Sequence, residues 1–162
     1  MGSLLLAFTF LAALGSGLIA GFFLAFSACV MAALGRISPA SGISAMQSVN
    51  VVVLNPVFLG TFFGTSALSL VLAVSALMNW AEPGAFDLLV GSLLYLIGSI
   101  LVTMICNVPL NDRLVAVKPE SAEGKTMWTH YLSVWTAWNH VRTVASLAAM
   151  ACFILAFARQ WS

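Results

Sequence analysis

Four long apolar runs constrain this chain more than any other feature of its sequence. Three of them cover approximately residues 3–34, 56–78 and 86–107, and the fourth begins between residues 121 and 125 and ends near residue 159. A helix that crosses a bilayer needs about 20 consecutive apolar residues. A soluble bundle of 162 residues, 62% of them hydrophobic, could not hide these runs. The sequence therefore predicts an all-α, polytopic membrane protein, a four-helix transmembrane bundle in which residues 1–162 form a single domain.

An additional amphipathic helix is expected between the first and second spans. It begins near Ser41, carries the polar stretch "MQSVN" at residues 46–50, and leads to Asn55-Pro56. Proline inside a helix removes a hydrogen bond and disfavours helical geometry in the residue before it. The chain should therefore bend at this dipeptide before the second span, which is expected to end near Met78.

Proline and charge also predict the remaining connections. The stretch "WAEPG" at residues 80–84 should form a tight second loop. Pro109 is expected to end or kink the third span near residue 107. A third loop should then run from about residue 111 to about residue 123, and it contains most of the charge of the chain.

Small residues recur every four positions along the first span. Such side chains allow a neighbouring helix to approach closely. The pattern therefore predicts a packing ridge, which could serve within the bundle or in a homo-oligomer. The ridge consists of Ala13, Gly17, Gly21, Ala25, Cys29 and Ala33.

The few charges predict how the chain sits in its membrane. The formal net charge is +1 and no basic patch exists, which excludes a nucleic-acid partner and leaves the lipid bilayer as the expected partner. Cytoplasmic loops are enriched in Lys and Arg. The expected first and third loops contain Arg36, Arg113, Lys118 and Lys125, whereas the other end has Arg159. The prediction is an integral protein of the bacterial inner (plasma) membrane with its first and third loops in the cytoplasm.

One basic residue, Arg142, lies inside the fourth apolar run. From Tyr131 to Trp161 the helix would be about 45 Å long, the thickness of a bilayer with its headgroups, so Arg142 lies about 6 Å from the midplane. A charge there costs about 2.5–3.5 kcal/mol, and intramembrane ionisable residues are functional candidates by default. The alternative is a structural arginine that binds backbone carbonyls or snorkels to the interface.

Other polar and aromatic residues are expected at the depth of Arg142. Trp135 and Asn139 share its helix face, and Trp138 flanks that face. Asp112 is the only carboxylate on the same side that could pair with Arg142. Their convergence predicts a pocket, open toward the third loop, for a planar, largely apolar molecule with an acidic or developing anionic oxygen. Asn107 should lie level with Arg142, and the second and third spans would add Asn111, Asn55, Asn50 and Gln47 in the same half of the membrane.

The cysteines and histidines predict no metal or haem site. The three cysteines are scattered singly without CxxC spacing. His130 and His140 lie on one helix and have no metal-ligand spacing to Cys, Asp or Glu, and a haem would need axial ligands across the bundle. In steps of 100° per residue, His140 points almost opposite to Arg142. His140 is therefore a candidate general base or a partner in a helix–helix hydrogen bond, and no cofactor is expected.

Four segments resemble a known family. "MQSVN", "NPVFLGTF", "CNVPLNDRL" and "WTHYLSVWTAWNHVRTVASLAA" are similar to the small membrane proteins that include fungal anthrone oxygenases, from about residue 46 to the end. The resemblance implies a four-helix membrane fold and oxidation of anthrones to anthraquinones by molecular oxygen, without an obvious metal or flavin. The residues that match the family pattern are Gln47, Asn50, Asn107, Pro109, Asn111, Trp135, Asn139 and Arg142.

The resemblance and the polar layer together suggest roles for individual residues. In this hypothesis Arg142 holds the oxyanion and Trp135 stacks on the substrate. Asn139 and Asn107 orient the oxyanion, and the general base is His140, Asp112 or water. The expected catalytic residues are Arg142, Asn139 and His140, and the expected substrate-binding residues are Trp135, Trp138, Asn107, Asn111, Asn55, Asn50 and Gln47.

Two non-enzymatic functions are the alternatives. The first is a protein that binds a lipid, a quinone or an aromatic anion without turnover. The second is a structural or assembly factor, in which the polar layer joins helices. A dry, fully satisfied network around Arg142 would favour the structural factor, whereas a cavity beside Arg142 would favour binding or catalysis.

Overall fold

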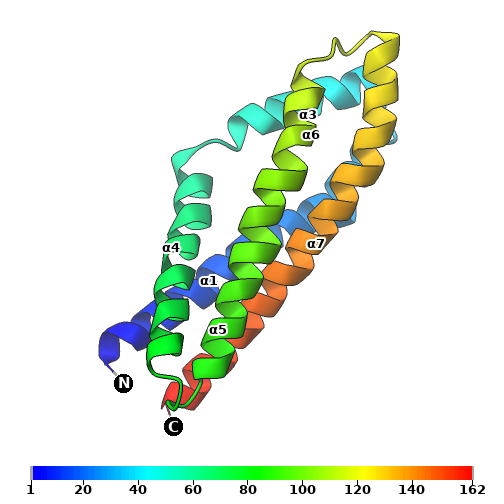
Figure 1. Cartoon of the computed structure of the whole chain (residues 1–162). Coiled ribbons are helices and arrows are strands. Elements are labelled where there is room, and N and C mark those ends of the chain that lie inside the picture. The colour runs from blue at the N-terminus through cyan, green and yellow to red at the C-terminus, as the bar shows by residue number, and fades with distance from the viewer. Residues whose placement is uncertain (1, 162) are drawn as a thin grey trace.

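The computed structural model describes residues 2–161, which form helices and short connections. No strand occurs in this part of the chain. Four helical segments are long and apolar enough to cross a membrane, namely Ser3–Leu34, Pro56–Met78, Ala85–Val115 and Ala122–Trp161. They form one elongated bundle with both termini at the same end (Figure 1). The predicted four-span architecture is confirmed, and the sidedness of the loops in a bacterial inner membrane stays a prediction.

The first span has the predicted bounds. It consists of α1 (Ser3–Ala25), a π-helical segment η1 (Phe26–Val30) and α2 (Met31–Leu34). Its buried face follows helical spacing through Ala12, Ser16, Ile19 and Phe23, and it packs chiefly against α7 (Ala122–Trp161). The first and last spans therefore form the central pair of the bundle.

The ridge of small residues on α1 packs within the chain only at its beginning. Ala13 is buried, and Gly17 lies against the Met150 side chain. A strict four-residue repeat turns by about 40° per step on a helix of 3.6 residues per turn, so the ridge leaves the buried face. The later members face outward, and they are Gly21, Ala25, Cys29 and Ala33. The predicted homo-oligomer stays a prediction.

The second span is reached through a short amphipathic helix and an elbow, as predicted. Helix α3 (Pro39–Val52) buries Gly42, Ile43 and Met46, and α4 (Pro56–Met78) begins at the predicted dipeptide. The Asn55 side chain accepts hydrogen bonds from the backbone N–H groups of the first turn of α4 and so caps that helix. Residues 53–55, which we call the elbow, lie between the two helices, and Figure 1 shows α3 and α4 arching away from the rod formed by α5 and α6.

The third span continues beyond its predicted end. It runs through α5 (Ala85–Leu93), two π-helical segments η2 (Leu94–Leu101) and η3 (Thr103–Asn107), and α6 (Val108–Val115). The end predicted near residue 107 is wrong, because Pro109 lies in the first turn of α6. Proline is tolerated there, and the widened π-helical backbone before it accommodates the missing donor. The third loop is therefore shorter than expected.

The fourth span, α7, begins within the predicted interval and ends close to the predicted residue. At its end, Arg159 Nη1 lies 3.0 Å from the Asp87 carboxylate at the start of α5. Nearby, Gly84 adopts a left-handed conformation with φ of 82° and packs against the backbone of Ala156. These contacts join the second loop to the end of α7.

The Gly84 turn generates a test of this junction. A Cβ atom at Gly84 would lie 3.0 Å from the Ala156 carbonyl oxygen, and the backbone there has positive φ. We expect Gly84→Ala to destabilise the folded protein by about 1–3 kcal/mol, measured as a lower Tm in detergent. The matched control is Gly60→Ala, where a Cβ meets nothing within 4 Å and the Tm should stay the same or rise. Equal Tm values for both variants would contradict the described junction.

Candidate active site

A cavity of about 430 Å³ lies beside Arg142, where the two apolar clusters of the core meet. Phe23 and Phe62 belong to the cluster toward the termini, whereas Phe26, Met46 and Trp135 belong to the cluster toward the third loop. All five side chains line the cavity. Its polar lining consists of Asn50, Thr103, Asn111, Asp112 and Arg142. The predicted convergence of polar and aromatic side chains around a hollow is therefore present.

Several apolar lining residues of the cavity are exposed at the side of the bundle. They include Val51 at the end of α3, Leu54 at the elbow, Phe63 on α4 and Met104 on η3. In a chain that spans a membrane, such side chains meet lipid. The cavity lining also includes Asp112 and Val115 of α6, which are exposed beside the third loop, and the opening toward that loop stays a prediction.

Neutral groups surround the Arg142 guanidinium. Nη2 donates to Asn139 Oδ1 at 2.7 Å and Nη1 donates to Thr103 Oγ1 at 3.2 Å. The guanidinium carbon lies 4.1 Å from the centre of the Phe23 ring and 5.2 Å from that of Trp135. Desolvated cation–π contacts of this kind are worth about 2 kcal/mol, which is comparable to the cost of a cation in the membrane. The cation is therefore held without a carboxylate.

The guanidinium keeps unused hydrogen-bond donors. Within residues 2–161, Arg142 Nε is buried without a hydrogen-bond partner, and the only ion pair is that of Arg159 with Asp87. Arginine has five N–H donors, and the hydrogen bonds to Asn139 and Thr103 use two of them. Because Arg142 is part of the cavity wall, its unpaired N–H groups lie beside the space that a ligand would occupy. The planar fork suits a carboxylate, enolate or phenolate oxygen.

Asn139 positions Arg142 instead of reaching the cavity. Its amide nitrogen donates to the Phe23 carbonyl and to Ser27 Oγ, each at 2.7 Å, and its oxygen accepts from Arg142. The side chain is fully buried and does not line the cavity. Asn139 therefore joins α7 to α1 and fixes the orientation of the guanidinium.

Asn107 lies behind the cavity as well. Its amide nitrogen donates to the Trp135 carbonyl at 3.2 Å, and the residue is fully buried. Its Oδ1 atom has no hydrogen-bond partner in the described part of the chain. The predicted role of Asn107 as a direct substrate contact thus requires a rearrangement, whereas its contact between the third span and α7 is already made.

Asn111 organises the aromatic wall. Its Oδ1 atom accepts from the Tyr131 hydroxyl at 2.7 Å and from Trp135 Nε1 at 2.8 Å. The rings of Trp128, Tyr131 and Trp135 are stacked in sequence, with centroids 5.8 and 5.6 Å apart. One amide oxygen therefore satisfies two buried donors and holds Trp135 at the edge of the cavity.

The other predicted residues from the second span separate into different places. Asn50 lines the Arg142 cavity. Gln47 instead donates to the backbone carbonyls of Leu114 and Val117, at 2.9 and 3.2 Å, and so ties α3 to the end of α6. Asn55 caps α4 and lines a separate pocket on the other side of the elbow.

Two predicted residues on α7 lie outside the site. His140 and Trp138 are both exposed, and neither lines the cavity. On a helix of 100° per residue, His140 is two positions from Arg142 and points to nearly the opposite side. Trp138 is one position from Asn139, so its side chain points about 100° away from that of Asn139. The structure therefore does not bring His140 or Trp138 together with Arg142.

Two important contacts of Arg142 were not predicted. Phe23 lies on the uniformly apolar first span, which contains no signal that separates it from other phenylalanines. Thr103 could have been found, because it is four residues before Asn107 on the same helix and so shares its face. Asp112, predicted as a possible ion-pair partner, lines the same cavity without forming that pair.

The family model for anthrone oxygenase matches residues 57–152. The chain belongs to the anthrone oxygenase family. No curated protein and no solved structure matches it. The matched region of this anthrone oxygenase family member includes Arg142, Trp135, Asn111, Thr103 and Asp112. Phe23 on α1 and Asn50 on α3 complete the cavity from outside that region.

No metal site is evident in this family member. Among residues 2–161, no three His, Cys, Asp or Glu side chains lie close enough to hold a metal ion together. The cavity itself contains a single acidic residue, Asp112, and no histidine or cysteine. Chemistry without a cofactor stays a prediction.

The double hydrogen bond to Asn111 can be tested by stability. We expect Asn111→Ala to destabilise the protein by about 2 kcal/mol or more, because the buried Tyr131 hydroxyl and Trp135 indole N–H both lose their acceptor. The measurement is the Tm in detergent together with the Trp emission maximum. Asn79→Ala, which removes one exposed hydrogen bond to the Ser75 carbonyl at the end of α4, is the control and should lower the Tm less than Asn111→Ala does. An Asn111→Ala variant as stable as this control would contradict the arrangement.

Proposed function

We propose that this protein oxidises a planar aromatic ketone of the anthrone type with molecular oxygen in the Arg142 cavity. The observation that carries the proposal is a buried guanidinium with unused N–H donors on the wall of a cavity with aromatic sides. The membership in the anthrone oxygenase family supports the same reaction class. A fixed cation stabilises the substrate most strongly when negative charge forms on it in the transition state, and such an interaction accelerates a reaction.

The chemistry uses the acidity of the substrate. Removal of a proton from the CH2 carbon across the ring from the carbonyl gives an anion whose charge is shared with the carbonyl oxygen. Arg142 stabilises that oxygen by charge and by hydrogen bonds. The electron-rich carbon reduces O2, a C–O bond forms, and return of the proton gives a hydroperoxide. Loss of the second hydrogen of that carbon as a proton, with cleavage of the O–O bond, gives the quinone carbonyl and one water.

Asp112 is the candidate general base of the three that the sequence suggested. Its carboxylate is the only titratable base on the cavity wall in the described part of the chain. His140 lies on the outer side of α7. Asp112 would take the proton directly or through one water and return it to the peroxide.

The aromatic wall supports the substrate class. Phe22, Phe26, Phe58 and Trp135 all line the cavity, and Phe26 lies 5.9 Å from the Trp135 ring. A planar polycyclic molecule stacks on such rings. Exclusion of water from this lining strengthens the electrostatic effect of Arg142. Of the predicted substrate-binding residues, Trp135, Asn111 and Asn50 keep that role in the proposal.

A non-enzymatic binding protein is the alternative. Its supporting observation is that Asp112, the only acidic residue on the described cavity wall, is exposed. A ligand that is already an anion would bind Arg142 and would not need to lose a further proton to Asp112. Such a protein would bind an aromatic anion, a quinone or a lipid and would not consume oxygen. Oxygen uptake separates the two functions.

Removal of the Arg142 charge is the principal test. With an anthrone such as emodin anthrone, the protein in nanodiscs should consume oxygen faster than the substrate autoxidises. Arg142→Met should lower this rate by about 10²–10³-fold, as for the loss of one preorganised oxyanion donor. Arg36→Met, at an exposed cation in the first loop, is the matched control and should retain the rate. Wild-type protein that leaves autoxidation unchanged would contradict the enzyme proposal for this substrate class.

The role of Asp112 requires a separate variant. Asp112→Asn keeps the shape of the side chain and removes the base, so we expect kcat to fall by about 10²-fold with little change in substrate Kd. Glu120→Gln, at an exposed acid in the third loop, should have normal kcat. If Asp112→Asn retained the wild-type kcat, water or another group would be the base.

A further inference from the structure

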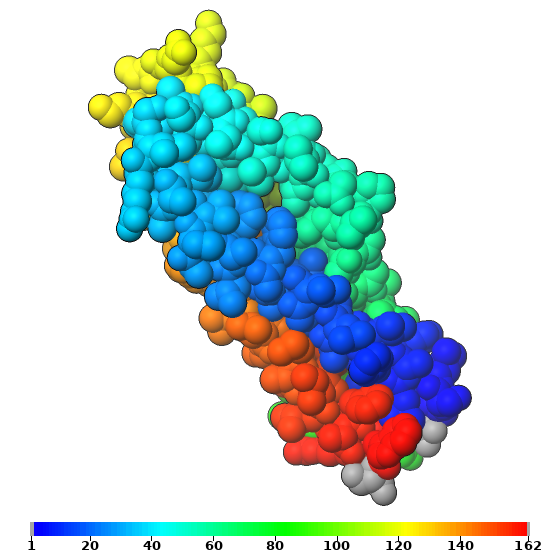
Figure 2. Space-filling model, turned by 180° about the vertical axis from the view of Figure 1, so that it is seen from behind, coloured from blue at the N-terminus to red at the C-terminus, as the bar shows by residue number. Residues whose placement is uncertain are grey.

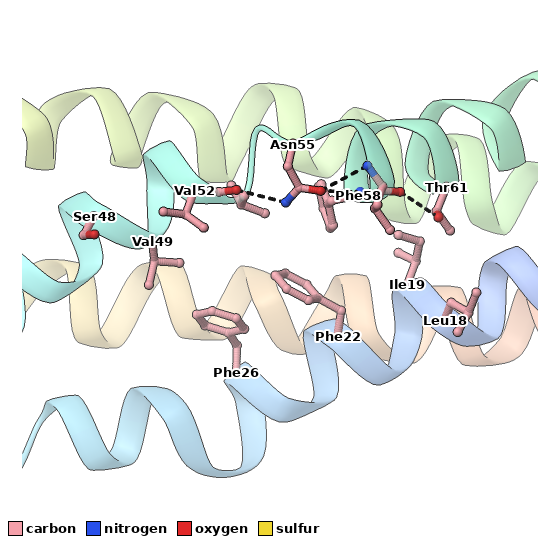
Figure 3. A pocket seen from close by; sticks show the side chains of 12 residues that line it. Leu18, Ile19, Phe22, Phe26, Ser48, Val49, Val52, Asn55, Phe58 and Thr61 are labelled. Atoms are coloured by element: carbon pink, nitrogen blue, oxygen red, sulfur yellow. Dashed lines mark hydrogen bonds between the residues drawn. The ribbon is translucent and has the colours of Figure 1, made fainter.

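A second pocket lies on the other side of the elbow from the Arg142 cavity. It has a volume of about 480 Å³ and is enclosed by α1 on one side and by α3 and α4 on the other. Figure 3 shows Phe22 of α1 and Phe26 of η1 pointing across this pocket toward Val49 and Phe58. We call this second pocket the tail pocket.

The tail pocket and the Arg142 cavity share their walls. Five residues line both: Phe22, Phe26, Val49, Val53 and Phe58. The two hollows are therefore separated by side chains beneath the elbow and not by a helix. The space-filling view from behind shows a depression between α1 and the α3–α4 arch (Figure 2).

The separating side chains can change position. The rings of Phe22 and Phe58 lie 4.9 Å apart and those of Phe22 and Phe26 lie 5.1 Å apart, so Phe22 is the common neighbour. Phe22 is partly exposed, and exposed side chains change rotamer within picoseconds to nanoseconds. A rotation of this ring would join the two hollows into one passage under the elbow.

The tail pocket is built for an apolar occupant. Three polar side chains line it, namely Ser48 of α3, Asn55 of the elbow and Thr61 of α4. Two of them are already engaged, because Asn55 Nδ2 donates to the Val52 carbonyl at 2.9 Å and Thr61 Oγ1 donates to the Val57 carbonyl at 2.9 Å. No charged residue lines it. Its outer rim includes Leu18 and Val57, which are exposed and meet lipid in a spanning chain. An alkyl chain fits these walls, and a charged head does not.

We propose that the substrate is an amphiphile whose aromatic ketone head binds at Arg142 and whose alkyl or isoprenoid tail passes under the elbow into the tail pocket. The proposal rests on the proposed function for the chemistry of the head. The exposed apolar rims of both hollows imply that the molecule enters sideways from the bilayer. Because lipid is about as apolar as the pocket, the tail adds only a modest affinity, through close packing against the pocket walls, and it also holds the head in register.

The test compares two probes in nanodiscs without oxygen, so that binding is separated from turnover. The first probe is 1,8-dihydroxyanthrone and the second is the same molecule with a decyl chain. Binding is measured by native mass spectrometry, with protein-free nanodiscs as the blank. We expect the wild type to bind the decyl probe about 10-fold more tightly, at the low end for discrimination by an apolar pocket.

A larger side chain in the tail pocket should remove only this difference. Thr61→Trp changes a residue that lines the tail pocket and not the Arg142 cavity. It should abolish the advantage of the decyl probe and leave the Kd of the short probe within about 2-fold. Val144→Trp, on the exposed face of α7 and outside both hollows, is the control that should keep the advantage. Ser48→Trp fills the tail pocket from α3 if the first variant does not fold.

The outcomes distinguish this inference from the proposed function. Equal binding of both probes by the wild type, or a decyl advantage that survives in both tail-pocket variants, overturns the tail proposal alone. A bilayer lipid retained in the tail pocket would produce the first of these results. If neither probe binds, or if binding is unchanged in Arg142→Met, the proposed function fails together with the inference. A photoreactive group at the end of the decyl chain should label α1, α3 or α4, and label only on other helices would contradict the passage.

Discussion

The burial of the Arg142 cation without a carboxylate is the interaction on which the rest of the site depends. Three helices contribute to it: α1 through the Phe23 ring, η3 through the Thr103 hydroxyl, and α7 through Asn139 and Trp135. Because these partners are neutral, they lower the cost of burial without cancelling the charge. The guanidinium therefore retains an unpaired positive charge toward the cavity, where an acidic oxygen would complete its coordination.

The elbow before α4 supplies the space that such a ligand needs. The capped start of α4 at Asn55 directs the chain outward and leaves hollows on both sides of the elbow. The hydrogen bonds of Asn107, Asn111 and Asn139 meanwhile hold the third and fourth spans and α1 together. Helix packing and the cavity thus depend on the same layer of amides.

How much the sequence could predict depends on the kind of signal each feature leaves. The number of spans and the bend at Asn55-Pro56 follow from local rules of hydropathy and proline geometry, and both were predicted. The continuation of the third span past Pro109 was not predicted, because no local sequence pattern specifies the π-helical segments that come before it. Depth counting identified Arg142, Trp135, Asn111 and Asn50 on the cavity wall. It also included Trp138, since depth alone does not state which way a side chain points, whereas helix geometry had already placed His140 almost opposite to Arg142.

The sequence by itself determined that this chain crosses a membrane four times and carries a cation near the middle of its last span, because apolar length and charge are properties of consecutive residues. Only the tertiary structure decided which neighbours that cation has. Phe23 and Thr103 lie 119 and 39 positions before Arg142, on helices whose rotation about their own axes no local pattern specifies. The tertiary structure also decided which amide side chains bind backbone carbonyls and which line the cavity, because each amide pairs with a group that helix packing brings within hydrogen-bond distance.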